Sequence, residues 1–154
     1  MQYKWLAVAL IVLIAPVLGL MIVNLFVRRP DNLGVKDGKL APCPASPNCV
    51  STQADDAGHR IEPIRFTGSA ADARTRLKQA IAALPRATIV TQTEDYLHVE
   101  CTSLLFRFVD DVEFWIDEAS EMIHFRSASR VGHGDLGVNR ARMETIRTAF
   151  QAQG

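Results

Sequence analysis

The hydrophobic pattern of the chain begins with a long apolar stretch: residues 6–27 contain no charged side chain and lie between Lys4 and the pair Arg28 and Arg29. A helix needs about 20 apolar residues to cross the hydrocarbon core of a bilayer. A small domain could hardly bury a helix that is apolar on every face. We therefore expect residues 1–29 to be a transmembrane anchor. A cleaved signal peptide is the alternative, but its apolar core is normally shorter and no clear cleavage site precedes Arg28.

The pattern changes after the apolar stretch. Residues 30–58 are rich in proline and glycine without helical or strand periodicity, which is typical of a linker that leads into an ordered loop. Residues 61–66 are a short strand candidate, which Pro63 restricts to a sheet edge. Ser69 and Asp72 form a capping box before a helical apolar repeat. The expected organisation is an anchor (1–29), a linker and cysteine loop (30–58) and an α+β domain (59–154).

Four further segments have the β-branched and aromatic composition of strands and are separated by short polar turns. Short turns between successive strands indicate an antiparallel meander. Residues 139–152 then return to a helical repeat. The expected fold is α+β in the order β-α-β-β-β-β-α: an antiparallel four- to five-stranded sheet with two helices on one face, preceded by one transmembrane helix. The strand segments are 88–93, 96–103, 104–116 and 122–129, and the third is either one bent strand or two.

Alternation along the meander places polar side chains on the sheet face opposite the apolar one. Two histidines and two carboxylates on neighbouring strands could bind a divalent metal or exchange protons: His98, Glu100, Glu113 and His124. Antiparallel sheets commonly expose one face, so we favour a solvated surface with cross-strand ion pairs. We therefore expect neither a metal nor a cofactor, and an enzyme is the less favoured class.

The stretch least typical of a scaffold follows the last strand, where glycines stand among arginines at the start of the final helix. Free amides at a helix N-terminus and nearby guanidinium groups attract anions. The alternative is a structural turn, in which a side chain of the turn caps the helix and the arginines pair with acids such as Asp110 and Asp111. The candidate anion site comprises Ser127, Ser129, Arg130, Gly132, Gly134, Asp135, Asn139, Arg140 and Arg142.

Charge and cysteine content narrow the function classes. The 17 Lys and Arg residues equal the 17 Asp and Glu residues in number, so net charge gives no argument for a nucleic-acid partner. Cys43 and Cys49 lie close together on a proline-rich turn, where a disulfide is favoured over an incomplete metal site or a thiol redox pair. A disulfide indicates an oxidising compartment, whereas the arginines after the apolar stretch favour a cytoplasmic domain.

Four runs of sequence resemble the uncharacterised family catalogued as domain of unknown function 1499: residues 33–53, which contain Cys-Pro-Ala-Ser-Pro-Asn-Cys, and residues 110–114, 126–132 and 135–140. The resemblance covers nearly all of the chain from Leu33 to Phe150. It implies a globular domain of bacteria and plastid-bearing organisms, often behind a signal or membrane segment. It implies no known activity and no established catalytic residues. With it, we expect a single-pass protein of the inner cell membrane whose domain lies on the periplasmic side.

Three function classes follow. The favoured one is a binding or assembly module that uses the Arg/Gly-rich loop to hold an anionic small molecule, a lipid headgroup or a partner in a membrane complex. A hydrolase or transferase could use the polar sheet face, or Ser127 with Asp135, but no spacing of nucleophile and base supports it. The third is a structural domain that docks a membrane complex by its sheet without a ligand.

Overall fold

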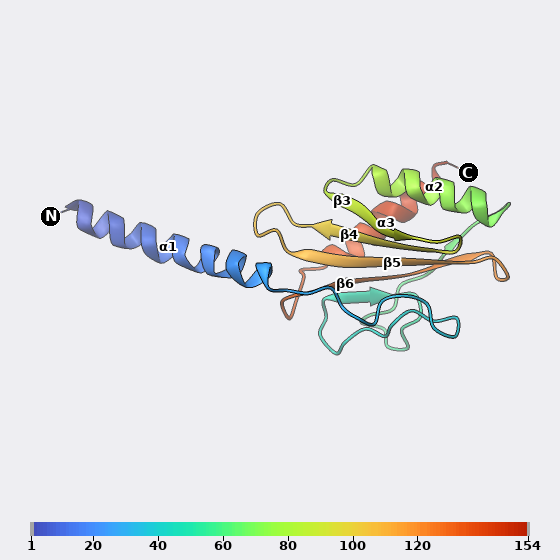
Figure 1. The fold of residues 1–154 in the computed structure, drawn as a ribbon, viewed down its shortest axis with the longest axis horizontal. Helices are drawn as coiled ribbons and strands as arrows, with labels where there is room; N and C mark the ends of the chain where they lie inside the picture. Colours follow the sequence, from blue (N-terminus) through green and yellow to red (C-terminus); the bar gives the residue numbers. More distant parts are fainter. Residues whose placement is uncertain (1, 154) are drawn as a thin grey trace.

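The computed structural model describes residues 2–153, in which a long helix projects from one end of a sheet that two further helices cover (Figure 1). Met1 and Gly154, the first residue of the expected anchor and the last of the expected domain, lie outside the described residues. The elements in chain order are α1 (Gln2–Leu25), β1 (Cys49–Ser51), β2 (Ile64–Arg65), α2 (Ala70–Ala82), β3 (Ala87–Gln92), β4 (Tyr96–Thr102), β5 (Val109–Asp117), β6 (Met122–Ser129) and α3 (Val138–Gln151).

Six strands form one antiparallel sheet in the order β1-β6-β5-β4-β3, with β2 also paired to β6. β1 pairs with β6 at Ala128 and β2 pairs with β6 at Ile123, so the two short strands share one edge of β6. The expected four- to five-stranded sheet is therefore too small. The strand that it lacks is β1, within the segment expected to be linker and loop. Three residues are too few to show alternation, and main-chain pairing alone defines this strand.

The expected transmembrane helix is also wrong. Within residues 2–153, no helix combines the length and the hydrophobicity needed to cross a membrane. The expectation relied on the length and apolar composition of an uncharged stretch, although Pro16 and Asn24 interrupt it. The end of α1 is held to the domain, because Asn24 Nδ2 donates to the carbonyl oxygen of Arg107 at 2.6 Å.

α2 and α3 cover one face of the sheet, above β3 and β4 in Figure 1. α2 begins at a Ser69 cap, whose hydroxyl accepts a hydrogen bond from the amide of Asp72 at 3.1 Å. Apolar residues at helical spacing on both helices meet the inward side chains of the meander, and their burial supplies the main driving force for folding. The core includes Ala73, Leu77 and Ile81 from α2, Met143, Ile146 and Phe150 from α3, and Leu97, Val99, Val112, Phe114, Ile123 and Phe125 from the sheet.

The other face of the sheet is covered by the chain's own segment after α1, which passes beneath the strands in Figure 1. Arg29 pairs with Glu100, and the amide of Gly34 donates to Glu113 at 2.7 Å. His98 and Glu113 are consequently buried, with 2% and 0% of their surface exposed. This face is therefore not the solvated surface that alternation alone suggests.

A disulfide joins Cys43 and Cys49, whose Cα atoms lie 5.7 Å apart. Because Cys49 is the first residue of β1, the bond fastens the preceding loop to the sheet. His59 adds a second connection: its Nδ1 lies 2.8 Å from Asp56 Oδ1 and its Nε2 lies 3.0 Å from the carbonyl oxygen of Ser46. The hydrogen bond to Asp56, followed by that to Ser46, raises the pKa of His59 above its ordinary value.

Candidate functional site

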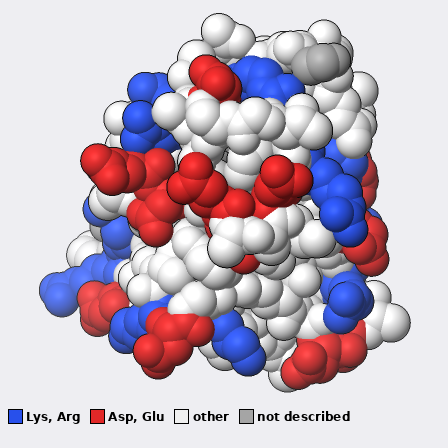
Figure 2. Space-filling view, turned by 90° about the vertical axis from the view of Figure 1, so that its right-hand side faces the viewer, with Lys and Arg blue, Asp and Glu red and all other residues white. Residues whose placement is uncertain are grey.

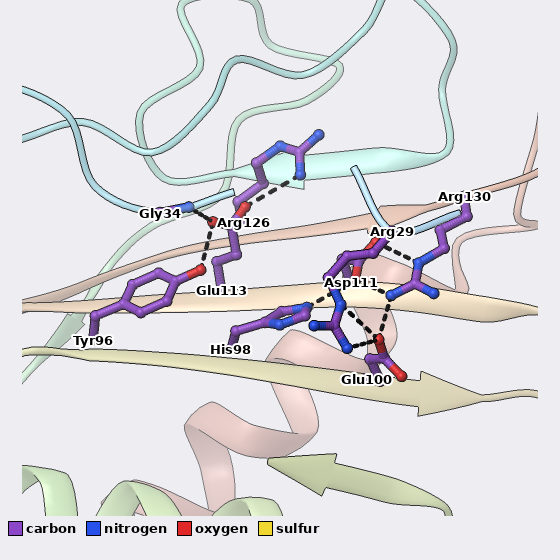
Figure 3. Close-up of polar contacts among 9 residues, drawn as sticks. All are labelled: Arg29, Gly34, Tyr96, His98, Glu100, Asp111, Glu113, Arg126 and Arg130. Carbon is purple, nitrogen blue, oxygen red and sulfur yellow. Dashed lines mark hydrogen bonds and ion pairs between the residues drawn. The ribbon is translucent and has the colours of Figure 1, made fainter. Parts of the chain in front are cut away.

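Asp111 is the centre of a buried ion-pair network on the covered face of the sheet (Figure 3). Its carboxylate lies 2.8 Å from His98 Nε2 and accepts two hydrogen bonds from the guanidinium of Arg130, at 2.6 and 2.8 Å. Burial alone would raise the pKa of Asp111, but the hydrogen bonds from Arg130 and His98 outweigh it and lower that pKa. The Asp111 carboxylate is therefore ionised, and both of its oxygens take part in hydrogen bonds.

Glu100 extends the network to the segment after α1. Arg130 Nη2 lies 2.5 Å from Glu100 Oε1, and Arg29 Nη2 lies 2.7 Å from the same oxygen. Hydrogen bonds from these two arginines exceed the effect of burial and lower the pKa of Glu100. Figure 3 shows that His98, Glu100 and Asp111 come from neighbouring strands, whereas Arg29 comes from the covering segment.

One group of described residues has ligand atoms close enough together to hold a metal ion: those of His98, Glu100 and Asp111 lie within 4.8 Å of one another. Both carboxylates, however, already bond the Arg130 guanidinium. A guanidinium shared by two carboxylates supplies the positive charge that a cation would bring. The geometry therefore favours an ion-pair network over a metal centre.

The two other residues of the predicted polar cluster lie elsewhere on the same face. Glu113 accepts hydrogen bonds from the Tyr96 hydroxyl at 2.9 Å and from the amide of Gly34, and lies 3.3 Å from Arg126 Nη1. Burial, together with the Glu113 carboxylate, raises the pKa of Tyr96, so the phenol stays protonated and donates. His124 stacks on Trp115 with 5.3 Å between ring centroids, and burial lowers its pKa. Glu113 thereby connects the sheet to the segment after α1 that covers this face.

The polar residues of the Arg/Gly-rich stretch mainly hold α3 in place. Asn139 is fully buried, and its Nδ2 donates to the carbonyl oxygen of Asn48 and to Ser129 Oγ, both at 3.0 Å. Ser127 Oγ donates to Asn139 Oδ1, and Asp135 Oδ2 accepts a hydrogen bond from the Asn139 amide at 2.8 Å. Asp135 thus satisfies an amide in the first turn of α3, whose N-cap is Gly137, and Asn139 connects the helix to β6.

The three arginines of this stretch do not converge on one point. Arg130 faces Asp111 and Glu100, whereas Arg142 Nη2 lies 2.5 Å from Asp110 Oδ2. Arg140 donates to the carbonyl oxygens of Arg60 and Gly58, both at 2.9 Å. Gly132 accepts a hydrogen bond at its carbonyl from Asn48, and Gly134 is exposed. The predicted anion-site residues are thus distributed over three local networks.

A surface that sequence reasoning missed lies where the β4–β5 loop (residues 103–108) and the β6–α3 loop (residues 130–137) leave the sheet, at the end of the domain that α1 adjoins in Figure 1. We call this surface the loop end. Three leucines project from it: Leu104 is 74% exposed, Leu105 66% and Leu136 103%. The sequence signal was the pair Leu104 and Leu105, but it was assigned to a strand that begins only at Val109.

The opposite end of the molecule carries a band of acidic side chains, which faces the viewer in Figure 2. Glu94, Asp95 and Glu118 from turns between strands, together with Asp117 at the end of β5, line a shallow hollow of about 990 Å³. The loop end instead contains the exposed Arg107, whose carbonyl oxygen bonds Asn24 near the end of α1, and the exposed Arg86 lies next to it, bonded to the carbonyl oxygen of Thr102. The acidic band and the exposed leucines therefore lie at opposite ends of the molecule.

The sequence profile of one family, described as a protein of unknown function (DUF1499), matches residues 39–150. The match spans most of the chain and includes the six strands, α2 and most of α3. No protein with a curated description matches the chain. The chain belongs to the DUF1499 family.

Proposed function

We propose that this member of the DUF1499 family is a non-catalytic binding module that docks by its loop end on the surface of an anionic lipid bilayer. The observation that carries the proposal is the exposure of Leu104, Leu105 and Leu136 on two loops at one end of the domain. Full burial of a leucine side chain is worth about 1.5–3 kcal/mol. The boundary between lipid headgroups and acyl chains accepts apolar side chains from an adjacent protein surface.

The backbone of Leu136 adds support. This residue has φ 54°, in the left-handed region that bulky side chains rarely adopt, and its side chain is completely exposed. Because the side chain is exposed, packing inside the domain does not offset the free-energy cost of that backbone conformation. Such local strain is often retained where a loop contacts a ligand or partner.

Charge supports an anionic surface over a neutral one. Exposed arginines accompany the apolar loops: Arg107 lies in the β4–β5 loop, Arg86 bonds the carbonyl oxygen of Thr102 just before that loop, and Arg28 follows α1, which bonds Arg107 through Asn24. Basic residues near an anionic membrane contribute about 1 kcal/mol each. The acidic side chains Glu94, Asp95, Asp117 and Glu118 lie at the far end, so repulsion would orient the domain with its loop end toward the lipid.

The burial and hydrogen bonding of the polar sheet face favour a binding module over a hydrolase or transferase. The carboxylates of Asp111 and Glu113 accept hydrogen bonds from buried neighbours, and the segment after α1 covers them. A catalytic acid or base needs access to its substrate. The Cys43–Cys49 disulfide supports an oxidising compartment, so we extend the proposal to the periplasmic face of the inner membrane.

Site-specific fluorescence tests the proposal in the full chain. The dye reports the polarity around the labelled residue, so its emission does not depend on what α1 contributes to binding. A Leu105→Cys variant labelled with an environment-sensitive nitrobenzoxadiazole dye is mixed with phosphatidylglycerol vesicles and, separately, with phosphatidylcholine vesicles. We expect a blue shift, and quenching by brominated acyl chains, with the anionic vesicles. The native Cys101 is 6% exposed and burial raises its thiol pKa, so it reacts more slowly than the thiol at position 105 and a brief labelling step is selective.

The matched control is Ala119→Cys, at an exposed position in the β5–β6 turn of the acidic end. Its label is expected to stay in water under all conditions. An unchanged spectrum at position 105 with bound vesicles, or equal shifts at positions 105 and 119, would overturn the proposal.

A further inference from the structure

We infer that a groove beside the loop end receives one acyl chain of a lipid from the surface on which the loop end docks. This inference rests on the proposed function and adds a ligand class to it. The groove has a volume of about 330 Å³ and lies between the first turns of α3 and the ends of β4 and the α2–β3 connection. This volume is at the lower end of the range for small-molecule pockets.

The apolar part of the groove suits a hydrocarbon chain, while Thr102, Ser103 and Thr145 add polar atoms to the lining. Leu84 lines one side, and Val138 and Ala141 of α3 line the other. Cys101 contributes an uncharged thiol, since burial raises its pKa. The one carboxylate of the lining, that of Asp110, is neutralised by Arg142 at 2.5 Å. The Asp110 and Arg142 charges therefore compensate each other, and the other charged side chain of the lining is that of Arg86.

The groove is continuous with the loop end. Ser103 lines it and is followed in the β4–β5 loop by Leu104, and Val138, which is 50% exposed, follows the β6–α3 loop. Arg86 is exposed on the rim, held by a hydrogen bond from its Nε to the carbonyl oxygen of Thr102 at 3.0 Å. A chain in the groove would thus leave its anionic headgroup beside a guanidinium and the apolar loops.

The dimensions favour a single chain over a peptide helix. An α-helix with side chains is about 10–12 Å across, which a space of this volume could not accept along two turns of α3. An acyl chain is narrow, flexible and wholly apolar. The same docking that inserts Leu104 and Leu105 would bring such chains to the opening.

Thiol labelling of Cys101 tests the inference, because Cys101 lines the groove while Cys43 and Cys49 are joined in a disulfide. The full chain is treated with N-ethylmaleimide, with and without lysophosphatidylglycerol held below its micelle concentration. At about ten times its Kd the amphiphile is expected to slow labelling about tenfold, since only the unoccupied protein reacts. No slowing at saturation would overturn the inference.

Two groove variants and one control test whether the amphiphile protects Cys101 by binding in the groove. Ala141→Trp fills the groove and Val138→Asp places a charge on its wall; both positions are exposed, so at least one variant should keep the fold. Each is expected to abolish protection of Cys101, whereas Thr148→Trp, at another exposed position of α3, should retain it. Protection that persists in a folded groove variant would contradict the inference.

The Leu105→Cys fluorescence measurement separates the two proposals. A blue shift on phosphatidylglycerol vesicles without Cys101 protection supports loop-end docking and refutes the groove. Cys101 protection by the free amphiphile without a blue shift refutes the docking, and with it the bilayer as the source of the chain.

Discussion

Asp111 holds the buried polar face of the sheet together, because it accepts hydrogen bonds from both His98 and Arg130 while only 1% of its surface is exposed. An Asp111→Asn substitution leaves the Arg130 guanidinium with less compensating charge. Breaking one side of a buried pair costs about 3 kcal/mol or more. We expect a loss of that size in the free energy of unfolding, measured by urea denaturation.

The control for Asp111 is Glu144→Gln, which breaks a pair with Arg147 in which the Glu144 side chain is 52% exposed. Exposed pairs contribute about 1 kcal/mol or less. If the two substitutions destabilise the protein equally, the network around Asp111 does not carry the stability assigned to it.

His59 gives the cysteine loop a pH dependence. Its pKa is raised by hydrogen bonds to Asp56 and to the carbonyl oxygen of Ser46, both of which favour the imidazolium. The resulting stability is fully present below the unfolded pKa of about 6.5 and is lost as pH rises through the higher folded pKa. In urea melts between pH 5 and pH 9, the stability difference between the native chain and His59→Gln should shrink as pH rises. A difference that grows with pH would contradict this assignment.

The candidate site could be predicted only in part from single residues. Alternation predicts that His98, Glu100 and Glu113 share a sheet face, because side chains two apart on a strand point the same way. It does not predict their burial, because the cover comes from Arg29 and Gly34, far away in sequence and in a segment without periodicity. Local spacing contains no information about such a contact.

At the scale of elements, the disulfide and β1 act together. The bond between Cys43 and Cys49 closes a short loop immediately before a strand of only three residues. Loop-closure entropy predicts that reduction lowers the free energy of unfolding by about 2 kcal/mol. We also expect faster amide exchange in β1 and unchanged exchange in β4, measured by mass spectrometry after treatment with a reductant. Equal changes in both strands would show that the bond stabilises the whole sheet instead of this edge.

Helical periodicity and capping motifs predict the helices correctly, whereas residue composition alone gives wrong boundaries for the strands. The capping box at Ser69 and the apolar repeat after it predict α2, because these are local features. β1 has no such signal and exists because the edge of β6 offers main-chain partners. Leu104 and Leu105 have strand composition but lie in a loop, since β5 begins at Val109. Composition could not distinguish an exposed apolar loop from a buried strand.

Across the whole molecule, the exposed leucines of the loop end lie opposite the end that carries the acidic band of Figure 2. Arg107→Gln is expected to weaken binding to phosphatidylglycerol vesicles by about 1 kcal/mol in co-sedimentation at low salt. The effect should diminish in high salt, where the screening length shortens. Arg74→Gln, at the acidic end, is the control and should leave binding unchanged. A larger loss for Arg74→Gln would reverse the proposed orientation.

Hydrogen–deuterium exchange of the full chain on phosphatidylglycerol vesicles tests the docking of the loop end most directly, because it reports on every segment at once without a label. We expect slower exchange in residues 103–108 and 130–137 on binding, with no change in the turns at residues 93–95 and 118–121. Protection confined to those acidic turns, or to the covered sheet face, with the two loops still exchanging freely, would contradict it.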